Sequence, residues 1–122
     1  MDEIITQLKT FGIDFDKSGG AFAEKEEYLS AVCNFFNSKD FMRLGQSVNR
    51  QQWQAAAMQA RRISDKANEL GIFAIERQMR GIRMNINAKN KEEVLGLLAN
   101  VIQKRVKILT YFQNIKRDEK KK

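Results

Sequence analysis

Residues 53–71, WQAAAMQARRISDKANELG, decide the fold of this chain. Their apolar side chains recur at spacings of 3, 4, 3, 4 and 3 residues, at Trp53, Ala56, Ala60, Ile63, Ala67 and Leu70. This spacing places the apolar side chains on one face of an α-helix. Asn49 is a favourable N-cap shortly before them, and Gly71 is a typical helix stop. The stretch therefore predicts a central helix whose small alanines let a neighbouring helix approach closely.

Segments before the central helix show the same helical periodicity. A short N-terminal helix is expected to end at Gly12, and residues 13–20 are expected to form a loop. A second helix is predicted from about Ala21 to Asn37. Ser38 is then expected to cap a short helix, whose apolar positions are Phe41, Leu44 and Val48.

Two more helices are predicted after the central one. The first has apolar residues at Ile72, Ile75, Met79, Ile82 and Ile86. A long final helix is predicted to begin near Lys91. Arg105 lies on its apolar face, where we expect it either to extend past the edge of the bundle or to pair with an acidic residue.

These helices predict an all-α protein. The chain has no proline and only 7 glycines in 122 residues, which favours helices because both residue types destabilise helix interiors. We expect an antiparallel four-helix bundle with one or two additional short N-terminal helices. Residues 1–116 are expected to form a single domain, and residues 117–122 a charged, disordered tail.

The net charge of +7 is unevenly distributed. Residues 1–49 carry 5 basic and 8 acidic side chains, whereas residues 50–122 carry 17 basic and 7 acidic ones. This asymmetry indicates an anionic partner for the second half. Solvated helix faces together with a basic tail would explain it equally well.

Several kinds of chemistry are excluded by composition. The chain has no histidine, so it has neither an imidazole base nor the histidine metal motifs of helical bundles. Cys33 is the single cysteine and is expected to be a small buried apolar residue, without a disulfide or zinc. We find no enzyme signature and expect no cofactor. A signal segment and a membrane span are not expected either, which favours a cytoplasmic protein.

The outer face of the central helix carries the candidate site. It lies away from the apolar seam and consists of Gln54, Ala57, Met58, Arg61, Ser64, Asp65 and Asn68. Arg61 follows the seam residue Ala60 directly and is expected to project into solvent at the edge of the bundle.

This arrangement resembles histidine phosphotransfer (HPt) domains, whose central motif is Ala-His-x-Leu-Lys-Gly with a further glycine ten positions after the histidine. Ala60, Ile63 and Gly71 match the alanine, the leucine and the closing glycine. Ala67 and Leu70 match buried positions between them. Other parts of the chain also resemble the family, so that the similarity spans roughly residues 4–115: Leu8, Gly12 to Asp14, Tyr28, Phe35 and Phe36, Phe41, Leu44, and Asn49 before Trp53.

Three positions depart from the family motif. Arg61 replaces the phosphoacceptor histidine, Ser64 replaces the lysine, and Asp65 replaces the glycine that gives a partner close access. A guanidinium group stays protonated and has no acceptor lone pair like that of imidazole. The resemblance therefore implies a module that cannot carry phosphate in the ordinary relay.

The resemblance also implies a partner, namely the receiver domain of a response regulator or a sensor kinase. Arg61, Arg62 and Lys66 would complement the acidic active site of a receiver. Arg77, Arg80 and Arg83 on the next helix would extend the basic surface. The full predicted partner surface is Gln54, Met58, Arg61, Arg62, Ser64, Asp65, Lys66, Asn68, Arg77 and Arg80. A fork from Arg61 to an acyl phosphate on the partner is a narrower version of this hypothesis.

Two other hypotheses compete with it. The basic second half and the lysine tail would suit nucleic acid, although no recognition-helix motif is present and most aromatic residues fall on apolar seams. Alternatively, the bundle would associate with itself through Tyr111 and Phe112 on the last helix. We expect a monomer or a weak homodimer.

Overall fold

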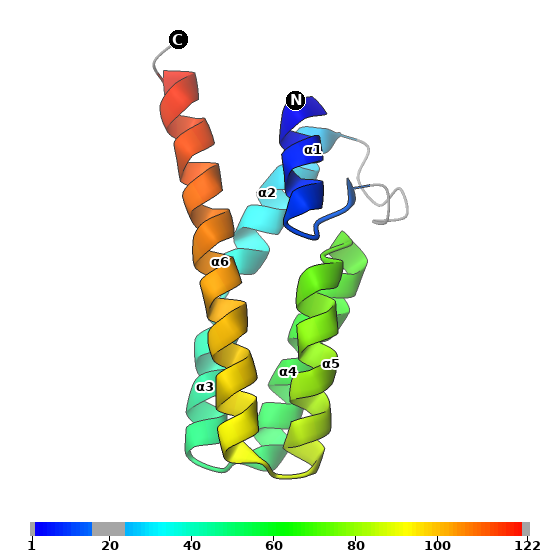
Figure 1. Cartoon of the computed structure of the whole chain (residues 1–122), viewed down its shortest axis with the longest axis vertical. Helices are drawn as coiled ribbons and strands as arrows, with labels where there is room; N and C mark the ends of the chain where they lie inside the picture. The colour runs from blue at the N-terminus through cyan, green and yellow to red at the C-terminus, as the bar shows by residue number, and fades with distance from the viewer. Residues whose placement is uncertain (1, 16–23, 121–122) are drawn as a thin grey trace.

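The computed structural model describes residues 2–15 and 24–120. Regular structure in these residues is entirely helical, which confirms the all-α prediction for this part of the chain. The helices are α1 (Asp2–Thr10), α2 (Lys25–Phe36), α3 (Asp40–Asn49), α4 (Trp53–Leu70), α5 (Phe73–Asn87) and α6 (Lys91–Lys120) (Figure 1). Over the described ranges, no helix is both long enough and apolar enough to cross a membrane.

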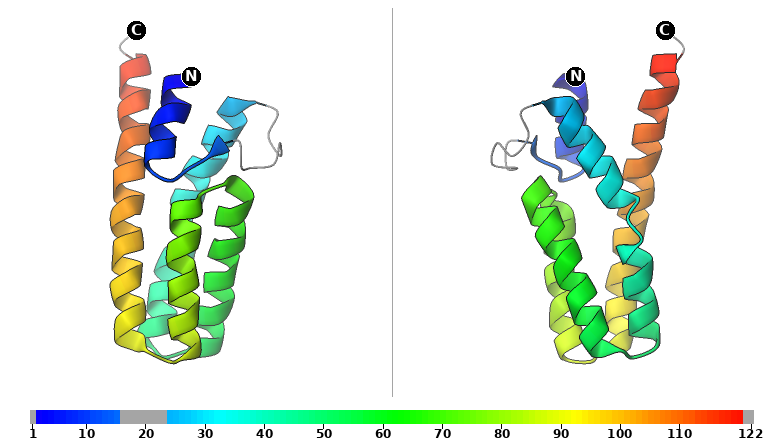
Figure 2. Two further views of the ribbon diagram at one scale, coloured as in Figure 1. Left: turned by 45° about the vertical axis from the view of Figure 1, so that its right-hand side comes forward. Right: turned by 180° about the vertical axis from the view of Figure 1, so that it is seen from behind.

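Helices α3, α4, α5 and α6 lie side by side in the lower half of the molecule (Figures 1 and 2). Helix α4 packs against α3 and α5, and α6 packs against the same two helices. Helices α4 and α6 therefore stand at opposite corners of this group. The core between them contains the predicted apolar seams, and every seam position of α4 except the half-buried Trp53 is buried.

The two ends of α4 are set by different residues. Gly71 ends the helix with a left-handed backbone (φ 72°), as its sequence predicts. Asn49 does not cap the start, contrary to expectation, because it is the last residue of α3. Gln52 takes the N-cap position instead, after a turn in which Gln51 is left-handed (φ 56°). The chain reverses direction in this turn, so Asn49 lies on the wrong side of it to cap α4.

Helix α1 and the segment after it dock onto the turn between α4 and α5. Gly12 has a φ of 80°, and a Cβ atom there would lie 2.4 Å from the Cβ of Ala74. The Asp14 N–H donates to the Gly71 carbonyl at 2.9 Å, and Ile13 is completely buried. Ile13 therefore belongs to the core, and Asp14 and Phe15 beside it are partly buried, whereas residues 16–20 of the predicted loop lie outside the described residues.

Tyr28 connects α2 to the end of α4. Its side chain is fully buried, and its hydroxyl donates a hydrogen bond of 2.5 Å to the Leu70 carbonyl. Its ring meets Phe15 edge-on, with 4.9 Å between centroids. Burial raises the pKa of Tyr28, because the ionised phenolate would lose its hydration, and the charge of Asp14 acts in the same direction.

The boundaries of two helices differ from the predicted ones. Helix α2 begins at Lys25, and residues 21–23 of the predicted helix lie outside the described residues. Helix α6 begins at Lys91, as expected, but continues to Lys120. Residues 117–120, predicted as disordered, are therefore helical, while 121 and 122 lie outside the described residues.

Two predictions about individual side chains are wrong. Tyr111 and Phe112 do not form a free apolar face, because the ring of Phe11 on α1 lies 5.6 Å from that of Tyr111, and Phe112 is buried. Cys33 is partly exposed rather than buried. Its sulfur lies 3.5 Å from the Asn37 side-chain amide, one turn further along α2.

Candidate functional site

The outer face of α4 presents Arg61 to solvent. Its side chain is 72% exposed and lies 3.9 Å from the carboxylate of Asp65, one helical turn away, which is equally exposed. Met58, one turn before Arg61, is 66% exposed although its side chain is large and apolar. The predicted projection of Arg61 away from the seam is therefore confirmed.

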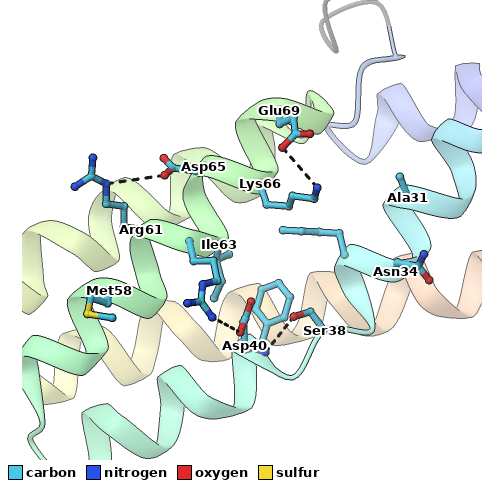
Figure 3. Close-up of a pocket in the computed structure, with 13 residues that line it drawn as sticks. Ala31, Asn34, Ser38, Asp40, Met58, Arg61, Ile63, Asp65, Lys66 and Glu69 are labelled. Atoms are coloured by element: carbon cyan, nitrogen blue, oxygen red, sulfur yellow. Dashed lines mark hydrogen bonds and ion pairs between the residues drawn. The ribbon is translucent and has the colours of Figure 1, made fainter. Parts of the chain in front are cut away.

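An open groove runs beside this face, between α4 and the junction of α2 with α3 (Figure 3). Its volume is about 760 Å³. The buried side chains of Phe35, Phe41 and Ile63 contribute its apolar floor. The groove lining as a whole consists of Ala31, Asn34, Phe35, Ser38, Asp40, Phe41, Met58, Arg61, Arg62, Ile63, Asp65, Lys66 and Glu69.

Charged side chains form the rim of the groove. Arg62 reaches across to Asp40 of α3 at 3.8 Å. Lys66 pairs with Glu69 at 3.5 Å along α4 (Figure 3). The basic members of these pairs are more than half exposed. Exposed ion pairs contribute only about 0–1 kcal/mol each, so these cations are able to exchange their present partners for another acidic group.

The break between α2 and α3 creates the second wall of the groove. Residues 37–39 interrupt the helix, and the Ser38 hydroxyl accepts the Asp40 N–H at 3.1 Å. Lys39, and not Ser38 as predicted, takes the N-cap position of α3. Arg105 of α6 donates a hydrogen bond to the carbonyl of Phe36, the last residue of α2 before the break. Its guanidinium also lies 5.9 Å from the centroid of the Phe41 ring. Arg105 therefore neither extends past the bundle edge nor pairs with an acid, since a helix-end carbonyl and an aromatic face occupy it.

The structure brings together half of the predicted partner surface in this groove. The residues concerned are Met58, Arg61, Arg62, Asp65 and Lys66. Gln54 is exposed and lines a smaller adjoining pocket of about 370 Å³ together with Met58 and Arg62. Asn68 is exposed two helical turns after Arg61, outside the groove, where it lines a separate pocket of about 310 Å³ with Glu76 of α5.

Ser64 does not belong to the exposed surface, contrary to prediction. It is only 5% exposed. The reason is its position on the helix, four residues after Ala60 and three before Ala67, both of which are completely buried. The buried face of α4 is therefore wider than its apolar residues alone indicate, and the small hydroxyl side chain fits into it.

The arginines of α5 form a separate surface. Arg77, Arg80 and Arg83 are exposed, as expected, but none of them lines the groove. Arg80 makes a two-pronged contact with Glu76 at 2.9 and 3.1 Å. The predicted continuous basic surface is thus interrupted by its own acidic partners.

The second wall of the groove was not predicted from the sequence. Asn34, Phe35 and Asp40 come from α2 and α3 and face α4 only because the chain breaks between these helices. The predicted break at residues 37–38 was the available signal, but it does not say which helix lies opposite. Among the described residues, no group of three or more acidic or thiol side chains is arranged to hold a metal ion.

Comparisons with protein-family models, with characterised proteins and with solved structures found no match to this chain. The class of protein is therefore defined by its own features: an all-helical fold with a charged, apolar-floored groove along one exposed helix.

Proposed function

We propose that this chain is an HPt-like docking module that binds a receiver domain, or the kinase that acts on one, and does not transfer phosphate. One observation carries the proposal. The structure places Arg61, which the HPt resemblance aligns with the phosphoacceptor histidine, on an exposed helix face beside an open groove. We infer that such a surface would still dock onto a partner after its reactive side chain has been replaced.

Phosphate transfer is incompatible with the residues at this face. The whole chain lacks histidine, and the guanidinium of Arg61 has no lone pair to attack a phosphoryl group. Ser64, at the position of the family lysine, is buried and cannot neutralise a phosphoryl charge at the surface. The activity that remains possible for these residues is docking onto a partner without phosphate transfer.

The charges around the groove favour an acidic partner surface. Arg61, Arg62 and Lys66 are all exposed, and their ion pairs are long, at 3.9, 3.8 and 3.5 Å respectively. A receiver active site is a cluster of carboxylates, which would replace these weak internal pairs. The exposed side chain of Met58 and the aromatic floor of the groove supply apolar contact area next to the charges.

Isothermal titration against a panel of receiver domains and kinase domains tests the proposal. Receivers would be added with and without a phosphate mimic, because a fork from Arg61 to phosphate predicts tighter binding of the mimic-loaded form. Arg61→Glu should weaken binding at least about tenfold, since it places like charges in contact. Lys107→Glu on α6 is the matched control, because it changes an exposed residue and the net charge by the same amount.

Two outcomes would overturn the proposal. One is an absence of binding to every receiver and kinase at low salt. The other is equal weakening by Arg61→Glu and Lys107→Glu, which would show that only overall charge matters. Tight, strongly salt-dependent binding to DNA or RNA in parallel titrations would favour the nucleic-acid hypothesis instead.

A further inference from the structure

Helix α6 carries two apolar stripes, of which the core uses only one. The first stripe is buried against the other helices, at Val94, Leu98, Val101, Ile108 and Phe112. The second stripe repeats at spacings of 4, 3, 4 and 3 residues, at Leu95, Ala99, Ile102, Val106 and Leu109. Such spacing is the signature of a helix that packs against another helix along its length.

The second stripe is open to solvent. Ile102 is 39% exposed and Val106 is 54% exposed, and Ala99 is also exposed. Leu95 and Leu109 at its ends are half-buried against the core and keep part of their surface outside. The other large apolar side chains that the described residues expose, such as Met84 on α5, belong to different helices.

We propose that this stripe, residues 95–109 of α6, is a homodimer interface in which two copies of α6 pack antiparallel. The positions of the three largest members are compatible with a twofold arrangement, because Leu95 and Leu109 lie seven residues before and after Ile102 and exchange places when one copy is reversed. Ile102 then meets its own copy at the centre, Leu95 faces Leu109, and the small Ala99 faces the larger Val106. Each contact between two different residues then occurs twice, once from each copy, as a twofold interface requires.

Charge supports a second copy over a different partner. The residues that border the stripe on its outer side are Gly96, Gln103 and Thr110, and none is charged. Two copies with a net charge of +7 each repel one another in general, so they can associate best along a surface free of charge. An acidic partner would instead be attracted by basic side chains along the border, which are absent from these three positions.

Gly96 provides a second observation at the same place. A Cβ atom there would meet no other atom within 4 Å, so nothing within the described chain requires a glycine. A glycine within a helix costs about 0.5–1 kcal/mol relative to alanine. Close approach of a second helix beside the end of the stripe would explain why this position is a glycine.

The expected dimer is weak and leaves the groove accessible. The stripe is about 21 Å long, at about 1.5 Å per residue, and a single helix pair of that length buries less than the roughly 800 Å² per subunit of a standard interface. The dimer should therefore dissociate on dilution. Helix α4 lies at the corner opposite α6, so each copy would keep its α4 surface free, and the dimer does not depend on the proposed docking function.

Sedimentation velocity over about 1 µM to about 1 mM protein tests the dimer, because a weak self-association becomes visible only across a wide concentration range. The wild-type mass should rise from 14.1 kDa towards twice that value. Ile102→Glu should weaken association by roughly a hundredfold, because the symmetric interface buries the substituted position twice. Met84→Glu, the same kind of change at a side chain that is 71% exposed on α5, should leave association unchanged.

Cysteine cross-linking tests the register of the two copies. In a Cys33→Ser background, Ile102→Cys should form an intermolecular disulfide readily, because the residue lies on the twofold axis. Lys107→Cys, an exposed residue on another side of α6, should not. The proposal is overturned if the wild type stays monomeric throughout, if both glutamate variants weaken association equally, or if both cysteine variants cross-link alike. Circular dichroism of each variant separates loss of association from loss of folding.

Discussion

Replacing Tyr28 with phenylalanine tests how α2 is attached to the end of α4. The change removes one hydroxyl from a fully buried side chain and breaks its 2.5 Å hydrogen bond to the Leu70 carbonyl. A hydrogen bond contributes about 0.5–1.5 kcal/mol net, and leaving a buried carbonyl unpaired adds to the loss. We therefore expect the free energy of unfolding to fall by about 1–2 kcal/mol. For a chain of this length that corresponds to a drop in Tm of about 3–8 °C.

The pH dependence of stability gives a sharper test of the same contact. The folded-state pKa of Tyr28 is raised by burial, whereas in the unfolded chain it returns to about 10. The unfolded state therefore loses a proton first as the pH rises, so wild-type stability is complete below pH 10 and falls above it. The slope contributed by this one group approaches about 1.4 kcal/mol per pH unit. Tyr28→Phe should lack this contribution.

Urea unfolding, followed by circular dichroism between pH 7 and 11, measures both effects. Tyr111→Phe is the matched control, since Tyr111 is only partly buried. Burial also raises the pKa of Tyr111, so Tyr111→Phe should lose a smaller share of the alkaline effect than Tyr28→Phe does. The control should change stability at neutral pH by less than about 0.5 kcal/mol. Unchanged stability of Tyr28→Phe at pH 7, or an alkaline slope equal to that of the wild type, would refute the reasoning.

Four further substitutions test other parts of the structure, Arg105→Leu by hydrogen exchange and the others by urea unfolding. Gly12→Ala should destabilise the fold by more than about 1 kcal/mol, because its φ of 80° disfavours alanine and the added methyl would lie 2.4 Å from a methyl on α5; an unchanged midpoint would contradict this docking. Arg105→Leu should increase hydrogen exchange at residues 36–40, since it removes the bond to the Phe36 carbonyl; unchanged exchange would show that the break holds without it. Ser64→Lys should cost more than about 2 kcal/mol and Asp65→Lys less than about 0.5 kcal/mol, because only the first side chain is buried; equal losses would mean that Ser64 is exposed.

Features that depend on neighbouring residues were predictable from the sequence. The apolar seam of α4, its stop at Gly71 and the start of α6 at Lys91 all agree with the predicted positions. Each of these depends on side-chain spacing along one helix or on the backbone preference of a single residue. The outward position of Arg61 follows from the same helical geometry.

Contacts between distant segments were not predictable in this way. Asn49 has a good capping side chain, but the turn after α3 places it at the end of the preceding helix. Arg105 was expected at a bundle edge or beside an acid, and its actual partner is a carbonyl 69 residues away. A sequence pattern records that a polar residue lies on an apolar face without recording which group meets it there.

The sequence by itself determined that the described chain is helical, where the central helix presents its apolar and polar faces, and that histidine chemistry is absent. The tertiary structure decided that Ser64 is buried, that the α2–α3 break faces α4 across an open groove, and that one apolar stripe of α6 remains exposed. The physical reason is the range of the forces involved. Helical periodicity acts over a few residues, whereas burial and groove shape depend on how whole helices pack against one another.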